Sequence, residues 1–159
     1  MKLLPRLALA ASLSAATPLA LQAQHSQKFT NEERYYFEGL ELFDRAQYGA
    51  AEQSFQQYLS SVVRRTGELR DRTADAEYYV AVSGLYLFHP DAEARILAFA
   101  ENNPAHPKAA AAYFELGKFY FDKKDYKAAV SYLSKVAPDN LTAEQRAEAE
   151  FKQGYAHFQ

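Results

Sequence analysis

Apolar side chains recur at intervals of three and four residues through most of the chain beyond residue 31. This spacing places them on one face of an α-helix. Polar corners such as Asp122-Lys123-Lys124-Asp125, and prolines such as Pro104, interrupt the periodicity. The pattern predicts an all-α chain with helices over residues 31–45, 49–65, 73–88, 91–102, 107–122, 126–136 and 142–158.

Two segments between the predicted helices carry further local signals. Residues 64–72 are rich in charge and contain Gly67, so we interpret them as an extended end of the second helix followed by a solvated loop. Thr142, with Gln145 three residues later, has the spacing of a capping box at the start of the last helix.

The clearest internal pattern lies in residues 113–133. It reads Y-x-x-L-G-x-x-Y, followed by Ala129 nine residues later and by Leu133 four residues after that. Residues 35–55 repeat this spacing, with Glu38 in place of the leucine. Glycine and alanine allow neighbouring helices to approach closely, and bulky residues three or four apart fill the space between them.

Two weaker copies complete the series. One begins at Tyr78, with Val82 in the glycine place and a turn at residues 89–91 that is about two residues short. The other begins at Phe151, with Gly154 in the glycine place, and only its first helix falls within the chain.

These copies resemble the 34-residue tetratricopeptide repeat, and their tyrosine-rich units are similar to those of exported bacterial multi-repeat proteins. The resemblance implies an all-α, tetratricopeptide-like helix–turn–helix solenoid, a right-handed superhelix of about three and a half repeats. The implied solenoid spans residues 32–159, with units at about 32–65, 75–106, 110–141 and an incomplete 148–159.

In the resembling family, the first helix of each unit lines a concave groove that binds a partner. Six of the nine corresponding side chains here are aromatic, which implies an apolar groove for an extended peptide or a partner helix. The alternative is that adjacent repeats cover these rings. The groove positions are Tyr36, Leu40, Phe43, Tyr79, Ser83, Tyr86, Phe114, Lys118 and Phe121.

The first 23 residues have the layout of a cleaved secretory signal. Lys2 and Arg6 precede an apolar run of leucine, alanine and serine, and Ala23 offers a cleavage point. An uncleaved amphipathic anchor is the alternative. We expect residues 24–31 to form a flexible N-terminus, and no integral membrane segment to remain after cleavage.

Charge and cysteine content indicate where the protein works. Loss of Lys2 and Arg6 takes the formal net charge from −2 to −4, which argues against general attraction to nucleic acid. The chain has no cysteine, so it has neither a disulfide framework nor a thiolate metal site. Export without disulfides favours the periplasm or envelope of a Gram-negative bacterium.

Residues with catalytic chemistry are scattered. None of the four histidines has a second histidine or a carboxylate at metal-motif spacing, and no nucleophile or phosphate-loop motif occurs. We therefore expect no catalytic residue, no metal and no cofactor. The family's carboxylate-gripping lysine and asparagine are also missing, since Tyr36 and Leu40, or Phe114 and Lys118, stand in their places.

The sequence thus predicts a non-catalytic scaffold in the bacterial cell envelope that binds a protein or peptide partner. The alternative is a non-catalytic N-terminal repeat region of a larger envelope enzyme or signalling protein. The incomplete fourth unit has two interpretations: a cap that ends the array, or the start of further repeats beyond Gln159. Its unpaired helix also offers a route to self-association.

Overall fold

The computed structural model describes residues 31–62 and 68–159, and every regular element in these ranges is helical. The predicted signal segment, residues 24–30 and residues 63–67 lie outside them. Helices α1 (Asn31–Asp44) and α2 (Tyr48–Ser61) form a first hairpin, α3 (Glu68–Tyr86) and α4 (Ala92–Asn102) a second, and α5 (Pro107–Asp122) and α6 (Tyr126–Leu133) a third. A 3₁₀ turn, Pro138–Asn140, then leads into α7 (Ala143–Phe158).

The predicted all-α class is confirmed, and most predicted helices agree with the structure within a few residues. One boundary prediction was wrong. Helix α2 ends at Ser61 rather than 65, because Val62 is already extended. Helix α3 begins at Glu68, so residues 68–72, predicted as a loop, are helical, and Arg72 makes a 2.6 Å ion pair with Glu33 of α1.

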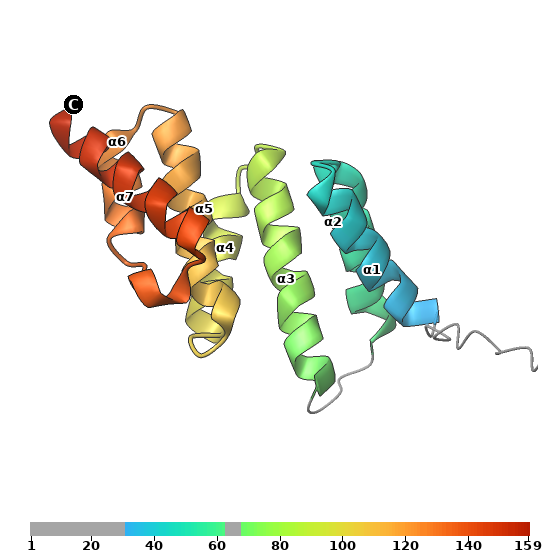
Figure 1. The fold of residues 1–159 in the computed structure, drawn as a ribbon. Helices are drawn as coiled ribbons and strands as arrows, with labels where there is room; N and C mark the ends of the chain where they lie inside the picture. The colour runs from blue at the N-terminus through green and yellow to red at the C-terminus, as the bar shows by residue number, and fades with distance from the viewer. Residues whose placement is uncertain (1–30, 63–67) are drawn as a thin grey trace, which may run out of the picture.

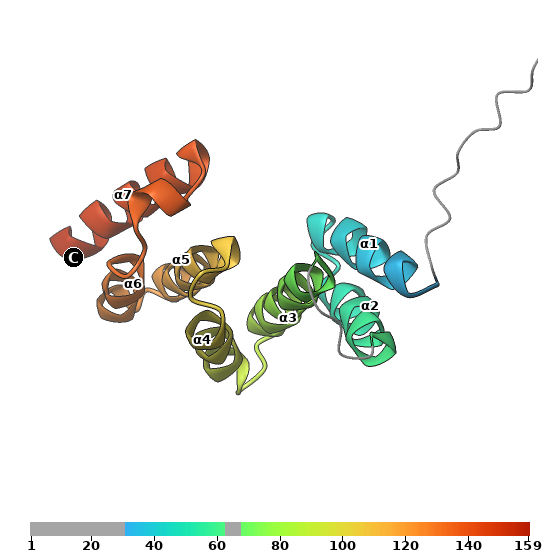
Figure 2. The same ribbon diagram turned by 90° about the horizontal axis from the view of Figure 1, so that it is seen from below.

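The helices stand side by side in a row that bends along its length (Figures 1 and 2). Each helix packs against the next one in the chain, and each odd-numbered helix also contacts the next odd-numbered helix. The core is accordingly a series of three overlapping apolar clusters: one around Phe55 and Tyr58, one around Val82, Leu85 and Ile96, and one around Phe114 and Leu133.

The three hairpin turns share one backbone conformation. Ala46, Phe88 and Lys124 each adopt a positive φ of 56–63°, two residues after a helix ends. In each turn the next residue donates its N–H to a carbonyl five residues earlier, with N···O distances of 2.9 Å. This is the Schellman arrangement, which satisfies the last carbonyls of a helix and reverses the chain.

A helix glycine sets the close approach within the first and third hairpins. A Cβ atom added to Gly39 would lie 2.8 Å from the Phe55 ring, and one added to Gly117 would lie 2.5 Å from Leu133 Cγ. In the second hairpin, Val82 and Ile96 fill the equivalent space with two buried side chains. Glycine therefore forms a notch that receives a bulky residue of the following helix.

Replacing Gly117 with leucine should lower the free energy of unfolding by about 1–3 kcal/mol, because the new side chain would overlap Leu133. Gly49→Leu in α2 is the matched control, since nothing lies within 4 Å of a Cβ atom there. Urea denaturation followed by circular dichroism measures both. Equal stabilities of the two variants would contradict the notch.

Candidate interaction surface

The structure separates the nine predicted groove residues into buried and partly exposed sets. Ser83, Phe114 and Tyr36 are only 0, 1 and 7 % exposed, so their side chains do not line an open groove. Phe114 is enclosed because α6, α7 and the segment between them close over it with Leu133, Val136, Leu141 and Ala149. For these three residues the expectation of an open groove was wrong.

Three of the other predicted rings, Phe43, Tyr79 and Tyr86, make contacts between the first and second hairpins. Tyr79 of α3 lies 4.8 Å from the Phe43 ring and stacks at 4.9 Å on Phe55 (centroid distances). Tyr86 stacks on Tyr48 of α2 at 4.6 Å. Leu40 packs against the same first cluster. These groove residues therefore join one hairpin to the next, which was the alternative that the sequence left open.

Tyrosine hydroxyls add polar bridges across the hairpin boundaries. Tyr36 of α1 donates to Asp75 Oδ2 of α3 at 3.0 Å, and Lys108 Nζ of α5 donates to the Tyr79 hydroxyl at 3.0 Å. Tyr86 of α3 donates to Glu115 of α5. Burial and the Glu115 carboxylate raise the pKa of Tyr86 well above its ordinary range, so the hydroxyl keeps its proton.

Lys118 belongs to the same inner set, because its Nζ lies 3.3 Å from Glu115 Oε2. Sequence reasoning missed Asp75, Lys108 and Glu115. Tyr79 to Lys108 and Tyr86 to Glu115 share one separation of 29 residues. That recurrence was the signal that could have pointed to Lys108 and Glu115.

Glu93 of α4 links the second hairpin to the third through hydrogen bonds with tyrosine hydroxyls. It accepts hydrogen bonds from the hydroxyls of both Tyr120 and Tyr132. The hydrogen bond to Glu93, assisted by burial, raises the pKa of Tyr120 from 10.0 to about 12. The carboxylate thus ties α4 to both helices of the next hairpin.

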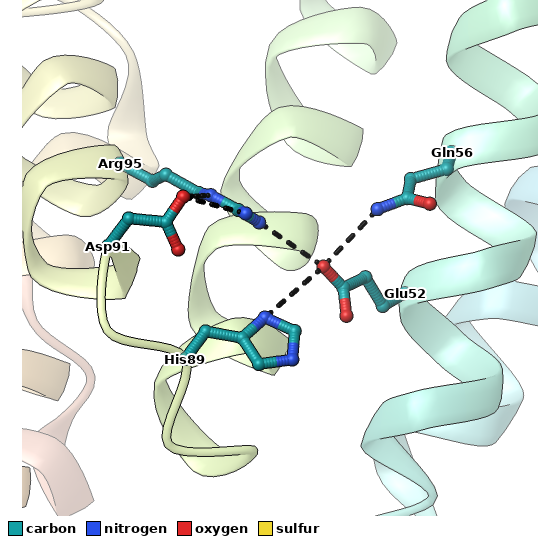
Figure 3. A network of polar contacts seen from close by, with 5 residues as sticks. All are labelled: Glu52, Gln56, His89, Asp91 and Arg95. Carbon is teal, nitrogen blue, oxygen red and sulfur yellow. Dashed lines mark hydrogen bonds and ion pairs between the residues drawn. The ribbon is translucent and has the colours of Figure 1, made fainter.

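Glu52 of α2 holds the first hairpin to the second (Figure 3). Its carboxylate is largely buried and lies 3.3 Å from Arg95 Nη1, 3.2 Å from Gln56 Nε2 and 3.8 Å from His89 Nδ1. Arg95 also pairs with Asp91 at 2.8 Å. A buried carboxylate needs such partners, because desolvation otherwise disfavours its charge.

A hollow of about 710 Å³ lies between the start of α3 and the α4–α5 loop. Asp75, His106 and Lys108 line it, with both His106 Nε2 and Lys108 Nζ 3.8 Å from Asp75 Oδ1. The other imidazole nitrogen, Nδ1, accepts the Lys108 N–H at the start of α5. Together with the Tyr36 hydrogen bond to Asp75, these groups connect α1, α3 and α5.

Among the described residues, helix α7 is the helix whose groove places carry exposed aromatic side chains. In α1 and α5, the groove places lie three residues before the helix glycine (Gly39 or Gly117), one residue after it and four residues after it. Counted from Gly154, these places hold Phe151, Tyr155 and Phe158, which are 67, 42 and 86 % exposed. The sequence pattern predicted Phe151 as the first aromatic residue of the fourth unit, but that residue lies four places before the glycine in the first and third units, and Phe151 lies three places before Gly154.

The third hairpin supports this surface from one side. The Phe121 ring of α5 lies 5.5 Å from Tyr155, and Tyr126 of α6 lies 5.8 Å from Tyr155. Gly154 itself has nothing within 4 Å of an added Cβ atom, unlike Gly39 and Gly117. We call Ala147, Phe151, Gly154, Tyr155 and Phe158 the α7 stripe.

A second exposed ring, Phe88 at 70 %, lies at the tip of the second hairpin. It contacts Phe119 at 5.8 Å, and Lys123 Nζ lies 5.4 Å from its ring centroid. Leu87 beside it is 37 % exposed.

No significant match was found with protein-family models, curated proteins or solved structures. Within residues 31–62 and 68–159, no helix has both the length and the apolar character needed to cross a membrane. The same ranges contain no group of three or more histidine, aspartate or glutamate side chains arranged to hold a metal ion.

Phe114→Ala should lower the free energy of unfolding by about 3–5 kcal/mol, since it opens a cavity in the third cluster. Phe121→Ala is the matched control, because Phe121 is only half-buried and should cost clearly less. Thermal and urea unfolding compare the two. Similar small losses in both variants would mean that Phe114 is not a core residue.

The Glu93 bridges predict a specific dependence of stability on high pH. Because the folded pKa of Tyr120 is raised, its contribution is complete below pH 10 and is lost as the pH rises through about 12. The free energy of unfolding should therefore fall more steeply above pH 10 in the native chain than in the Tyr120→Phe, Tyr132→Phe double variant. Urea titrations at pH 9–12 test this, and parallel profiles would contradict it.

Proposed function

We propose that this chain is a tetratricopeptide-like, non-catalytic scaffold of the bacterial envelope that binds a protein helix on its α7 stripe. The observation that carries the proposal is the unused notch at Gly154. Gly39 and Gly117 each receive a bulky residue from a neighbouring helix, whereas Gly154 presents the same small residue to open space. An aromatic surface beside an open notch is suited to an amphipathic helix.

Burial and exposure along α7 support this assignment. Ala149 and Ala156 face the rest of the protein and are 7 and 8 % exposed. The opposite face is the α7 stripe, so the helix is apolar on both sides. Exposed apolar stripes on helices are typical of interaction sites, because burying each ring releases apolar surface from water.

The inner helices favour a structural rather than a binding role for most predicted groove residues. Tyr36, Tyr79 and Tyr86 already have polar partners in the next hairpin. A partner that inserted between them would have to break these bonds. We therefore assign partner binding to α7 and assign hairpin-to-hairpin cohesion to the inner aromatic residues.

Site-specific photo-crosslinking in the producing cell tests the proposal. With benzoylphenylalanine in place of Phe151 or Phe158, irradiation should give discrete protein adducts. Gln57, exposed on α2, is the control position and should give none. Absence of adducts at 151 and 158, or the same adducts at 57, would contradict binding on the α7 stripe.

A further inference from the structure

We propose that the helix bound on the α7 stripe is α7 of a second copy of this chain, in an antiparallel pair related by a two-fold axis. This inference rests on the proposed function and names the partner. It starts from four residues of the α7 stripe that alternate small and bulky side chains: Ala147, Phe151, Gly154 and Phe158. The fifth, Tyr155, lies toward one edge of the stripe on an ideal helix.

The spacing of these four residues is four, three and four, and so reads the same in both directions. When a second α7 lies antiparallel, Phe151 of one copy meets Gly154 of the other, and Phe158 meets Ala147. Both phenylalanines thus face a small residue, and the two-fold axis makes each contact twice. The stripe is complementary to itself.

The hairpins of this protein already contain the same contact. In the first hairpin, Phe55 packs into the notch at Gly39 from a helix that runs antiparallel to α1. A phenylalanine seated over a helix glycine is therefore a stable local arrangement in this chain. The proposed pair would repeat it between two copies.

Polar residues beside the α7 stripe also match in this register. Glu150 would lie about 3 Å along the axis from His157 of the second copy, on the same flank. On the other flank, the Tyr155 hydroxyl would lie equally close to Glu148 of the second copy. Tyrosine–glutamate hydrogen bonds of this kind already join the hairpins at Tyr86 and Glu115.

The size of the contact predicts a reversible dimer. With about 200 Å² for each ring, the exposed parts of Phe151, Tyr155 and Phe158 would contribute on the order of 800 Å² over the two copies. The rings alone therefore supply less than the roughly 1,000 Å² of a stable specific interface, as in a weak, transient pair. We expect a dissociation constant in the micromolar range.

Sedimentation equilibrium of the chain, purified as the producing cell accumulates it, tests the pair. The native chain should change from monomer to dimer over micromolar concentrations. Gly154→Leu should weaken association at least tenfold without altering the fold, because nothing contacts that position in the monomer. Gly49→Leu is the matched control and should dimerise like the native chain.

Phe158→Ser, at an 86 % exposed position, provides a second variant should Gly154→Leu misfold, and it should also weaken the dimer at least tenfold. A native chain that stays monomeric, or a Gly154→Leu variant that dimerises normally, would overturn the proposal. A monomer that forms photo-adducts from position 151 with a different protein would overturn only the second-copy partner and leave the proposed function standing.

Cross-linking tests the antiparallel register directly, because the chain has no cysteine of its own. A mixture of Ala147→Cys and Gln159→Cys should link 147 to 159 with a short bismaleimide. Ala147→Cys alone should not link to itself, since the two positions would lie about 16 Å apart along the axis. Efficient 147–147 links would show a parallel pair and overturn the register.

Discussion

The architecture depends on how closely one helix can approach the next. Gly39 and Gly117 allow Phe55 and Leu133 to pack against the helix backbone itself, at distances that leave no room for a Cβ atom. The three turns with positive φ then reverse the chain at the same point relative to each helix end. Together these two features repeat one hairpin geometry along the row, while Val82 and Ile96 give the second hairpin a side-chain-filled version of it.

Contacts between neighbours hold the hairpins in their row. Each boundary combines apolar packing with charged groups that accept or donate hydrogen bonds: Glu52 with Arg95 at the first boundary, and Glu93 with two tyrosine hydroxyls at the second. Tyrosine suits this work because its ring packs while its hydroxyl reaches a polar partner. Stability in such a row arises from each unit and its neighbours. Among the described residues, helix α7 keeps Phe151, Tyr155 and Phe158 exposed.

The sequence predicted the helical elements well, because period and turn residues are local signals. The capping box of Thr142 and Gln145 is present as predicted. The helix prediction failed at residues 68–72. Their charge density indicated a loop, but the segment forms the first turn of α3. The groove prediction failed for Phe114 because motif spacing gives the face of a helix but not what covers it, and here α6 and α7 close over the ring. Asp75, Lys108 and Glu115 could not be found from local spacing, since their partners lie 29 or 39 residues away. Export and location in the envelope remain predictions.

The central claim is that the α7 stripe is a self-complementary surface, and amide chemical shifts in a dilution series test it most directly. On dilution from millimolar to micromolar concentration, the account predicts shift changes concentrated at residues 147–158, with midpoints that coincide across these residues. The α1–α2 hairpin should show no change. Shifts that do not depend on concentration, or changes centred on another surface such as the tip at Phe88, would contradict it.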